Sequence, residues 1–205
     1  MSSSHLSVHF VSNISTASFT MLPMLPGEPP LLFIDFEASS LLPGTFPVEV
    51  GWVGDGVPGE SHLIHPGPFE GWGDWSYESE AIHGISQDML RSQGQPAEWV
   101  ARRFLKALQG RQGVVGSITY DSMWLVLLLE VIGGDAPRLL SEETALHQAA
   151  LTILEDASAA RVCVRAAREA RLGDIVYHRA LPDAESSFRL YRTVVELAEA
   201  RKASR

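Results

Sequence analysis

Short apolar runs separated by turn-forming residues predict three strands in the first third of the chain. The run at 31–39, LLFIDFEAS, is flanked by proline-rich sequence and is typical of a buried strand. Segment 48–54 alternates apolar and polar positions, and segment 61–66 follows the turn-forming DGVPG, so the two predict an antiparallel series. EAIHGI predicts a short helix that Gly84 closes.

From Pro96 onward the hydrophobic pattern becomes helical. A helix is expected over 96–110, with proline in its first turn and glycine at its end. The later segments predict a buried strand at 113–118, an apolar helix that ends at Gly133, a short strand at RLLS, and helices at about 141–157, 158–172 and 183–202. Three early strands followed by strands that alternate with helices indicate an α/β or α+β protein with a mixed sheet.

Length and composition fit one soluble domain. We expect a single domain at 31–205 and a poorly ordered N-terminal extension at 1–30, which is rich in Ser, Thr and Pro. No apolar run reaches the roughly 18 residues of a membrane span. Cys163 is the only cysteine, which excludes an intrachain disulfide and a Cys-rich zinc site. We expect Cys163 to be a small buried hydrophobe and the protein to be cytoplasmic.

Charge is distributed unevenly along the chain. All 16 Lys and Arg residues lie between Arg91 and Arg205, whereas residues 1–90 contain 11 of the 25 acidic residues. One half of the chain could therefore gather cations while the other half meets phosphates. An ordinary split of surface charge is the alternative, and composition alone does not separate the two.

Two acids interrupt the first apolar run. Asp35 and Glu37 are two residues apart, so their side chains point to the same face of the predicted sheet. Burying two uncompensated carboxylates would be costly, and no Lys or Arg lies within 50 residues on either side. A bound divalent cation is the natural compensation, and carboxylate oxygens suit Mg²⁺ or Mn²⁺.

Three further residues have ordinary explanations when each is taken alone. Asp121 lies where the predicted strand 113–118 leads into the apolar helix, and a helix N-cap is the simpler explanation for it. Asp183 follows Pro182, where an acid is expected at a helix start because of the helix dipole. His178, five residues earlier, is by itself more often a surface histidine than a catalyst.

The order of these residues changes that interpretation. Asp-x-Glu on a first strand, Asp at a strand–helix junction and His-x-x-x-x-Asp before the last helix resemble the DEDDh group of 3′–5′ exonucleases. This is the superfamily of the DNA polymerase III proofreading subunit, ribonuclease T and oligoribonuclease. The resemblance runs from about Leu31 to about Leu197; its anchors are FIDFEAS, YDSMWL and YHRALPDA, supported by FPVEVGWV and IHGIS. The sister group has Tyr four residues before its final Asp, and Arg179 at that position favours the histidine form.

The resemblance implies a ribonuclease H-like α/β fold with a mixed five-stranded sheet flanked by helices. It also implies two divalent cations, Mg²⁺ or Mn²⁺, that lower the pKa of the attacking water and stabilise charge on the phosphoryl oxygens. Carried onto this sequence, the metal ligands are Asp35, Glu37, Asp121 and Asp183, and Asp35 is able to bridge both ions. The implied general base is His178.

The implied substrate is the 3′ end of single-stranded RNA or DNA, and the products are nucleoside 5′-monophosphates. Short oligonucleotides are favoured because the chain is acidic overall. The residues that match nucleotide-binding positions of the family are Ala38, Ser39, Ser40, Leu41 and His83. A plain strand-exit loop and a structural histidine are the alternatives for these residues. The ribonuclease members are often dimers, which suggests a homodimer by analogy alone.

Two other groups of residues have two explanations each. The aromatic residues of a Gly-rich loop could stack on bases or anchor the loop to the core: Trp72, Trp75 and Tyr77. A run of arginines at helical spacing could meet a phosphate backbone or form a solvated helix face: Arg161, Arg165 and Arg168. Trp124 is expected in the core.

Two functions other than nuclease activity are open at this point. A nucleic-acid-binding or regulatory module could keep the fold without turnover, although the presence of every acid and of the histidine argues against it. A two-metal phosphatase acting on small phosphoesters would use the same ligands. Product analysis with oligonucleotides and a small phosphodiester separates all three.

Overall fold

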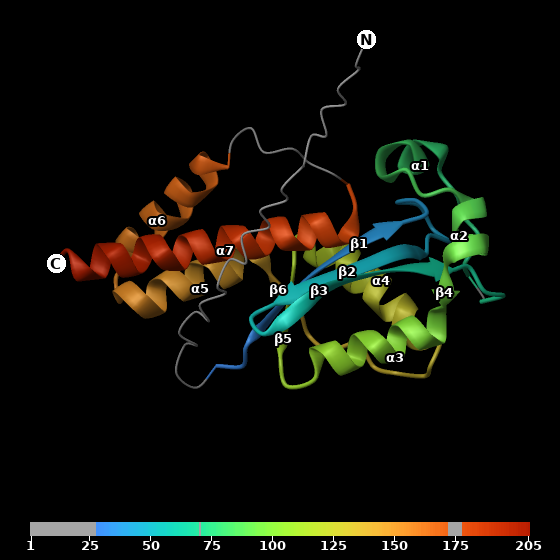
Figure 1. The fold of residues 1–205 in the computed structure, drawn as a ribbon, viewed down its shortest axis with the longest axis horizontal. Coiled ribbons are helices and arrows are strands. Elements are labelled where there is room, and N and C mark those ends of the chain that lie inside the picture. The colour runs from blue at the N-terminus through green and yellow to red at the C-terminus, as the bar shows by residue number, and fades with distance from the viewer. Residues whose placement is uncertain (1–27, 70, 172–177) are drawn as a thin grey trace, which may run out of the picture.

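The computed structural model describes residues 28–69, 71–171 and 178–205. Six strands form one mixed sheet in the order β4-β3-β2-β1-β5-β6 (Figure 1). Their bounds are β1 Leu31–Ala38, β2 Pro47–Gly54, β3 Val57–His65, β4 Gln95–Pro96, β5 Gln112–Val115 and β6 Leu140–Ser141. The predicted extension, residues 1–30, falls almost entirely outside the described residues.

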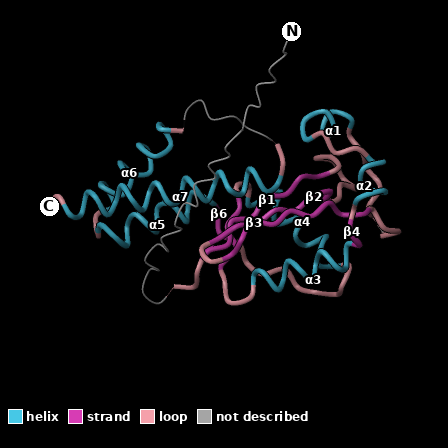
Figure 2. The backbone as a smooth tube through the Cα atoms, viewed as in Figure 1, coloured by secondary structure: helices cyan, strands magenta, loops and turns pink. Residues whose placement is uncertain are grey.

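Helices cover the sheet and extend beyond it (Figure 2). Their bounds are α1 Tyr77–His83, α2 Gln87–Gln93, α3 Ala97–Leu108, α4 Ile118–Glu130, α5 Glu142–Leu154, α6 Ala157–Ala170 and α7 Ala180–Ala203. Helix α7 crosses the sheet and its C-terminal half packs with α5 and α6 (Figure 1). Among the described residues, no helix combines the length and the apolar character that a membrane crossing requires.

Strand β1 lies at the centre and divides the core into two layers. It pairs antiparallel with β2 and parallel with β5, and β2 pairs antiparallel with β3. Because side chains alternate along a strand, Phe33 faces α7 whereas Ile34 and Phe36 face α3 and α4. Trp124 of α4 is buried in the second layer, as predicted, and its indole nitrogen donates to the Thr45 hydroxyl at 3.3 Å.

Small side chains let α5, α6 and α7 pack closely in the core layer that contains Phe33. The buried positions of α5, α6 and α7 are rich in alanine, and Cys163 is buried among them with its thiol free. This confirms the prediction that Cys163 is a small buried hydrophobe.

The predicted elements are largely confirmed, with several corrections. Strand β3 begins at Val57, inside the segment DGVPG that was expected to form the turn. The strand expected over 113–118 ends at Val115 and helix α4 begins at Ile118, because the Ser117 hydroxyl caps the helix by accepting from the Tyr120 N–H. Helix α7 begins at Ala180 rather than at 183. The short helix α2 was not predicted.

The sheet has six strands, not the five that the resemblance implied. The additional strand is β4, which pairs parallel with the end of β3 at Ile64 and His65. Gly94 explains why β4 can reach β3: a Cβ atom at this residue would lie 2.7 Å from the His65 nitrogen.

Candidate metal centre

Three of the four predicted ligands meet at the C-terminal end of β1. Asp35 and Glu37 lie on the face of β1 that α7 covers, as their spacing predicted, and Asp183 comes from the first turn of α7. One carboxylate oxygen from each of the three lies within 4.8 Å of the others, and all three residues are half-buried. Carboxylates this close can share a cation.

The sheet is shaped to receive the start of α7. Gly51 of β2 pairs with Asp35 across the sheet. A Cβ atom at Gly51 would lie 2.3 Å from the Leu181 nitrogen and 2.5 Å from the Ala180 carbonyl carbon. The missing side chain therefore lets the first turn of α7 rest directly on β2, which brings Asp183 over the carboxylates of β1.

Asp121 approaches the same end of the sheet from α4. Strands β1 and β5 are parallel with Ile34 opposite Val115, so the chain that leaves β5 emerges beside Asp35. Asp121 is buried in the first turn of α4, and its Oδ2 accepts the Ser117 N–H at 2.9 Å. The N-cap residue is Ser117, although Asp121 contributes to capping through this bond. Asp121 lies outside the group of three oxygens within 4.8 Å.

The carboxylates in this cluster are poorly compensated. Burial, and after it the charges of the neighbouring acids with Asp121 first, raise the pKa of Asp35 to about 9. Burial and the charge of Asp183 raise the pKa of Glu37 to about 8. Burial raises the pKa of Asp121 to about 7, although the Ser117 N–H opposes that change. The surroundings thus disfavour the ionised form of all three carboxyl groups, and a bound divalent cation would stabilise that form. The oxygen donors fit Mg²⁺ or Mn²⁺.

A fifth carboxylate, which no sequence pattern singled out, lies beside these acids. Glu49 of β2 is opposite Glu37 and is 2% exposed. Its Oε2 accepts from the Arg179 Nε at 2.9 Å and its Oε1 accepts from the second Arg179 nitrogen at 2.7 Å. Arg179, from the basic half of the chain, therefore pairs with an acid of the acidic half. Its guanidinium is engaged by Glu49.

His178, the predicted general base, lies directly before the first turn of α7. The residue is exposed and its φ is 47°, in the left-handed region. Its ring forms no hydrogen bond or ion pair with another described residue. The imidazole is thus accessible to solvent near Asp183, and its role as a base stays a prediction.

The predicted nucleotide-binding residues after β1 are mostly buried. Ser39 accepts the Phe46 N–H at 3.0 Å through its hydroxyl oxygen, and the Ser40 hydroxyl accepts the Leu42 N–H at 3.2 Å. Ala38 is buried too, whereas Leu41 is 61% exposed. The serine hydroxyls shape the strand-exit loop, and Leu41 offers an apolar surface at its tip. A nucleotide contact by these four residues stays a prediction.

His83 has the geometry of a structural histidine. It ends α1, is 5% exposed, and accepts the Ile85 N–H through Nδ1 at 3.0 Å. Burial lowers its pKa, while the nearby Ala38 carbonyl works in the opposite direction. A neutral ring with Nε2–H directed toward the end of β1 fits these contacts. Its predicted contact with a nucleotide stays untested.

The two tryptophans of the aromatic loop anchor it to the core. Trp72 stacks on Phe46 with ring centroids 5.4 Å apart, and Trp75 donates from its indole nitrogen to Glu80 at 2.8 Å. Tyr77 is instead 77% exposed at the start of α1. Of the three aromatic residues, only Tyr77 is largely exposed, and base stacking by any of them stays a prediction.

The arginines of α6 lie away from the acid cluster of Asp35, Glu37 and Asp183. Two of the arginines lie next to acidic side chains of α5 and α6. Arg168 forms ion pairs with Glu142 and Glu143, and Arg165 lies 3.8 Å from Glu169. Helix α6 packs on the C-terminal half of α7 (Figure 1). These contacts favour the solvated-face explanation.

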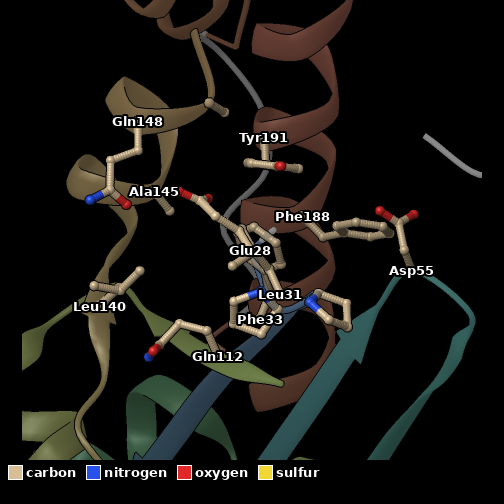
Figure 3. A pocket seen from close by; sticks show the side chains of 13 residues that line it. Glu28, Leu31, Phe33, Asp55, Gln112, Leu140, Ala145, Gln148, Phe188 and Tyr191 are labelled. Atoms are coloured by element: carbon tan, nitrogen blue, oxygen red, sulfur yellow. The ribbon is translucent and has the colours of Figure 1, made fainter. Parts of the chain in front are cut away.

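A cavity of about 230 Å³ lies at the opposite end of β1 from the acids. Phe33, Phe188 and Tyr191 form an aromatic part of its wall, and the acids Glu28 and Asp55 also line it (Figure 3). One wall is formed by Glu28–Pro30, which directly follow residues that the structure does not describe. The cavity is separate from the candidate metal centre.

The fold is similar to that of solved exonucleases. E. coli exonuclease I in its zinc-bound complex with single-stranded DNA gives a TM-score of 0.60 at 12% identity, over 86% of this chain and 42% of that one. The nuclease domain of 3′hExo, a DEDDh family member bound to rAMP, gives 0.56 at 14%, over 85% and 96%. S. pombe Pop2p in its Mg²⁺- and Mn²⁺-bound form gives 0.50 at 12%, over 80% and 81%.

These similarities confirm the predicted fold class. The chain has the ribonuclease H-like α/β fold of these solved structures, one of which is a DEDDh family member, and it spans less than half the length of the exonuclease I chain. No family model and no curated protein matches the sequence.

Proposed function

We propose that the protein is a metal-dependent 3′–5′ exonuclease that shortens single-stranded RNA or DNA and releases nucleoside 5′-monophosphates. The observation that carries this proposal is the meeting of Asp35, Glu37 and Asp183 within 4.8 Å, in a fold shared with solved exonucleases. The buried Asp121 beside them supplies the fourth acid of the DEDDh pattern.

Asp35, Glu37, Asp121 and Asp183 are the residues that would hold two divalent cations. Asp35 is central in this set because the charges of the other three all act on it, which suits a ligand shared between two ions. Bound there, the ions would lower the pKa of the attacking water and stabilise charge on the phosphoryl and leaving 3′ oxygens.

The remaining steps belong to the chain's own residues. His178 accepts the proton of the attacking water, because it is exposed and directly precedes the helix turn that carries Asp183. Leu41 and Tyr77 present exposed apolar surface that would pack against the terminal bases. The net charge of −9 favours short oligonucleotides, because less phosphate backbone has to be held.

A product analysis tests the proposal. Single-stranded RNA and DNA oligonucleotides, labelled at the 5′ end or at the 3′ end, are incubated with the protein and Mg²⁺, Mn²⁺ or a chelator. We expect 5′-labelled strands to shorten one nucleotide at a time and 3′-labelled strands to release a labelled 5′-monophosphate, only with metal. Asp183→Asn is the matched inactive control.

Two results would contradict the proposal. Binding of single strands without any shortening would favour the non-catalytic module. Hydrolysis of a chromogenic phosphodiester with no attack on oligonucleotides would favour a phosphoesterase for small substrates. Self-association, which the resemblance suggested, is checked on the same sample by light scattering.

A further inference from the structure

Glu49 is a buried acid that differs from its neighbours. Two of its hydrogen bonds come from the Arg179 guanidinium, one comes from the Ser61 hydroxyl at 2.8 Å, and one comes from the Ala180 N–H at 3.1 Å. Burial opposes its ionisation, but these donors outweigh burial and lower its pKa. Its oxygens are therefore occupied by the protein, and it does not belong to the three acids within 4.8 Å.

Three of the four hydrogen bonds to Glu49 come from Arg179 and Ala180, the two residues that directly follow His178. Arg179 is the N-cap residue of α7, and its own side chain forms no capping hydrogen bond. Glu49 supplies a cap from the neighbouring strand instead, because it accepts the first N–H of the helix and places a negative charge at the positive end of the helix dipole.

This contact determines where the start of α7 lies. On one side of Arg179, His178 has a left-handed backbone, a conformation that costs free energy for a residue with a side chain. On the other side, Asp183 follows within one turn. Gly51, two residues beyond Glu49 on the same face of β2, provides the flat surface on which Ala180 and Leu181 rest.

We propose that Glu49 and Arg179 form a positioning pair that holds His178 and Asp183 in place over Asp35 and Glu37. The bidentate ion pair anchors the connection into α7 to the centre of the sheet, 130 residues away in sequence. Neither residue touches the substrate in this assignment. The expected effect on turnover rests on the proposed function. The position of the start of α7 can be tested without substrate.

The test uses Glu49→Gln and Arg179→Gln in the full chain, each of which removes the ion pair; the first is isosteric with the residue it replaces. In metal-free protein, we expect hydrogen exchange at the Ala180 amide to rise at least about tenfold. Calorimetric affinity for Mn²⁺ should fall by roughly 10–100-fold, the usual effect of removing a group that orients metal ligands. The turnover number should fall by a similar factor, with KM for a short oligonucleotide changed less than about twofold.

Three comparisons separate positioning from general destabilisation. The double variant should be no worse than either single variant, because both remove the same contact. Arg179→Lys should recover only part of the turnover, since an ammonium group cannot bind Glu49 through two nitrogens. Arg189→Gln, which removes an exposed ion pair with Glu185 on the same helix, should match the wild type in every measurement.

The outcomes also separate this inference from the proposed function. A wild-type protein that binds Mn²⁺ but releases no nucleotide would overturn the function, while faster Ala180 exchange and weaker Mn²⁺ binding in Glu49→Gln would still support the positioning pair. Folded Glu49→Gln and Arg179→Gln proteins with wild-type exchange, Mn²⁺ affinity and turnover would overturn the positioning pair.

Discussion

The two ends of β1 present the same face to the same helix, yet their contacts are opposite in character. At Phe33, α7 contributes Phe188 and Tyr191, whose ring centroids lie 5.5 and 5.3 Å from that of Phe33 (Figure 3). At Asp35 and Glu37, four residues or fewer further along, α7 contributes another acid, Asp183.

This difference distinguishes an end that stabilises the fold from an end that has the character of a ligand site. The aromatic end buries apolar surface, which stabilises the fold. The acid end places like charges together at a cost in stability, and such a cost is typical of a functional site that an ion or a substrate completes. The same helix thus serves both purposes because its first turn and its middle meet different residues of one strand.

The largest effect is expected when the acid end loses a ligand. Asp35→Asn or Asp183→Asn should reduce nucleotide release by roughly 10³-fold or more, because stabilisation of the transition-state charge is lost. Thermal unfolding without metal should show that both variants fold and are at least as stable as the wild type, since a repelling charge is gone. Wild-type release rates in both variants would refute the site assignment.

The next largest effect separates the base from the metal ligands. His178→Ala should lower the turnover number by about a hundredfold or more, in the range of general-base catalysis. Mn²⁺ affinity measured by calorimetry should stay within about twofold of the wild type, because His178 lies outside the acid cluster. Unchanged turnover would remove His178 from the mechanism.

The aromatic end should respond in stability instead of activity. Phe188→Ala removes a buried ring that packs on Phe33, and should lower the free energy of unfolding by about 3–5 kcal/mol. Turnover per folded molecule, measured well below the unfolding temperature, should be nearly unchanged. Urea titration gives the stability, and a selective loss of activity in a stable variant would contradict the division between the two ends.

A smaller effect is expected from pH in the metal-free protein. The pKa values of Asp35 and Glu37 are raised to about 9 and about 8, so the folded protein holds protons that the unfolded chain has released. Stability should therefore fall as the pH rises from 7 to 9. His83 does not affect this window because its pKa is lowered from 6.5. Mn²⁺ should reverse the trend, and a melting temperature that rises over this window without metal would contradict it.

The smallest effect is expected on the remote helix α6. Replacing Arg161 and Arg165 with Gln should change KM for a short oligonucleotide by less than about twofold, because α6 lies away from the acid cluster and Arg165 already has an acidic neighbour. A large rise in KM, measured at low and at physiological salt, would restore the phosphate-binding explanation.

Local patterns in the sequence were sufficient to predict most of the fold. The apolar run of β1 and the Gly84 cap of α1 act over a few residues, so their signals are readable without tertiary contacts. The end of β5 was placed too late because the apolar Ile118 continued the strand pattern, whereas the Ser117 cap ends it. Strand β4 depends on the close approach of Gly94 to His65, which no local pattern records.

The candidate site was predicted in part for the same reason. Asp35 and Glu37 stood out because they interrupt an apolar run and share a face. Glu49 was missed because a single acid in an alternating strand has the pattern of a solvent-facing position. Its burial depends on Arg179, 130 residues later, and only the folded chain shows that the two meet. The available signal was an acid placed between two valines in VEVGWVG.

Binding of divalent cations at the acid end of β1 can be observed by anomalous scattering from crystals grown with Mn²⁺ and a nucleoside 5′-monophosphate. We expect two peaks about 3.5–4 Å apart, with Asp35 between them and the other ligands drawn from Glu37, Asp121 and Asp183. Crystals that contain millimolar Mn²⁺ and show no peak in contact with Asp35 or Glu37 would contradict this expectation.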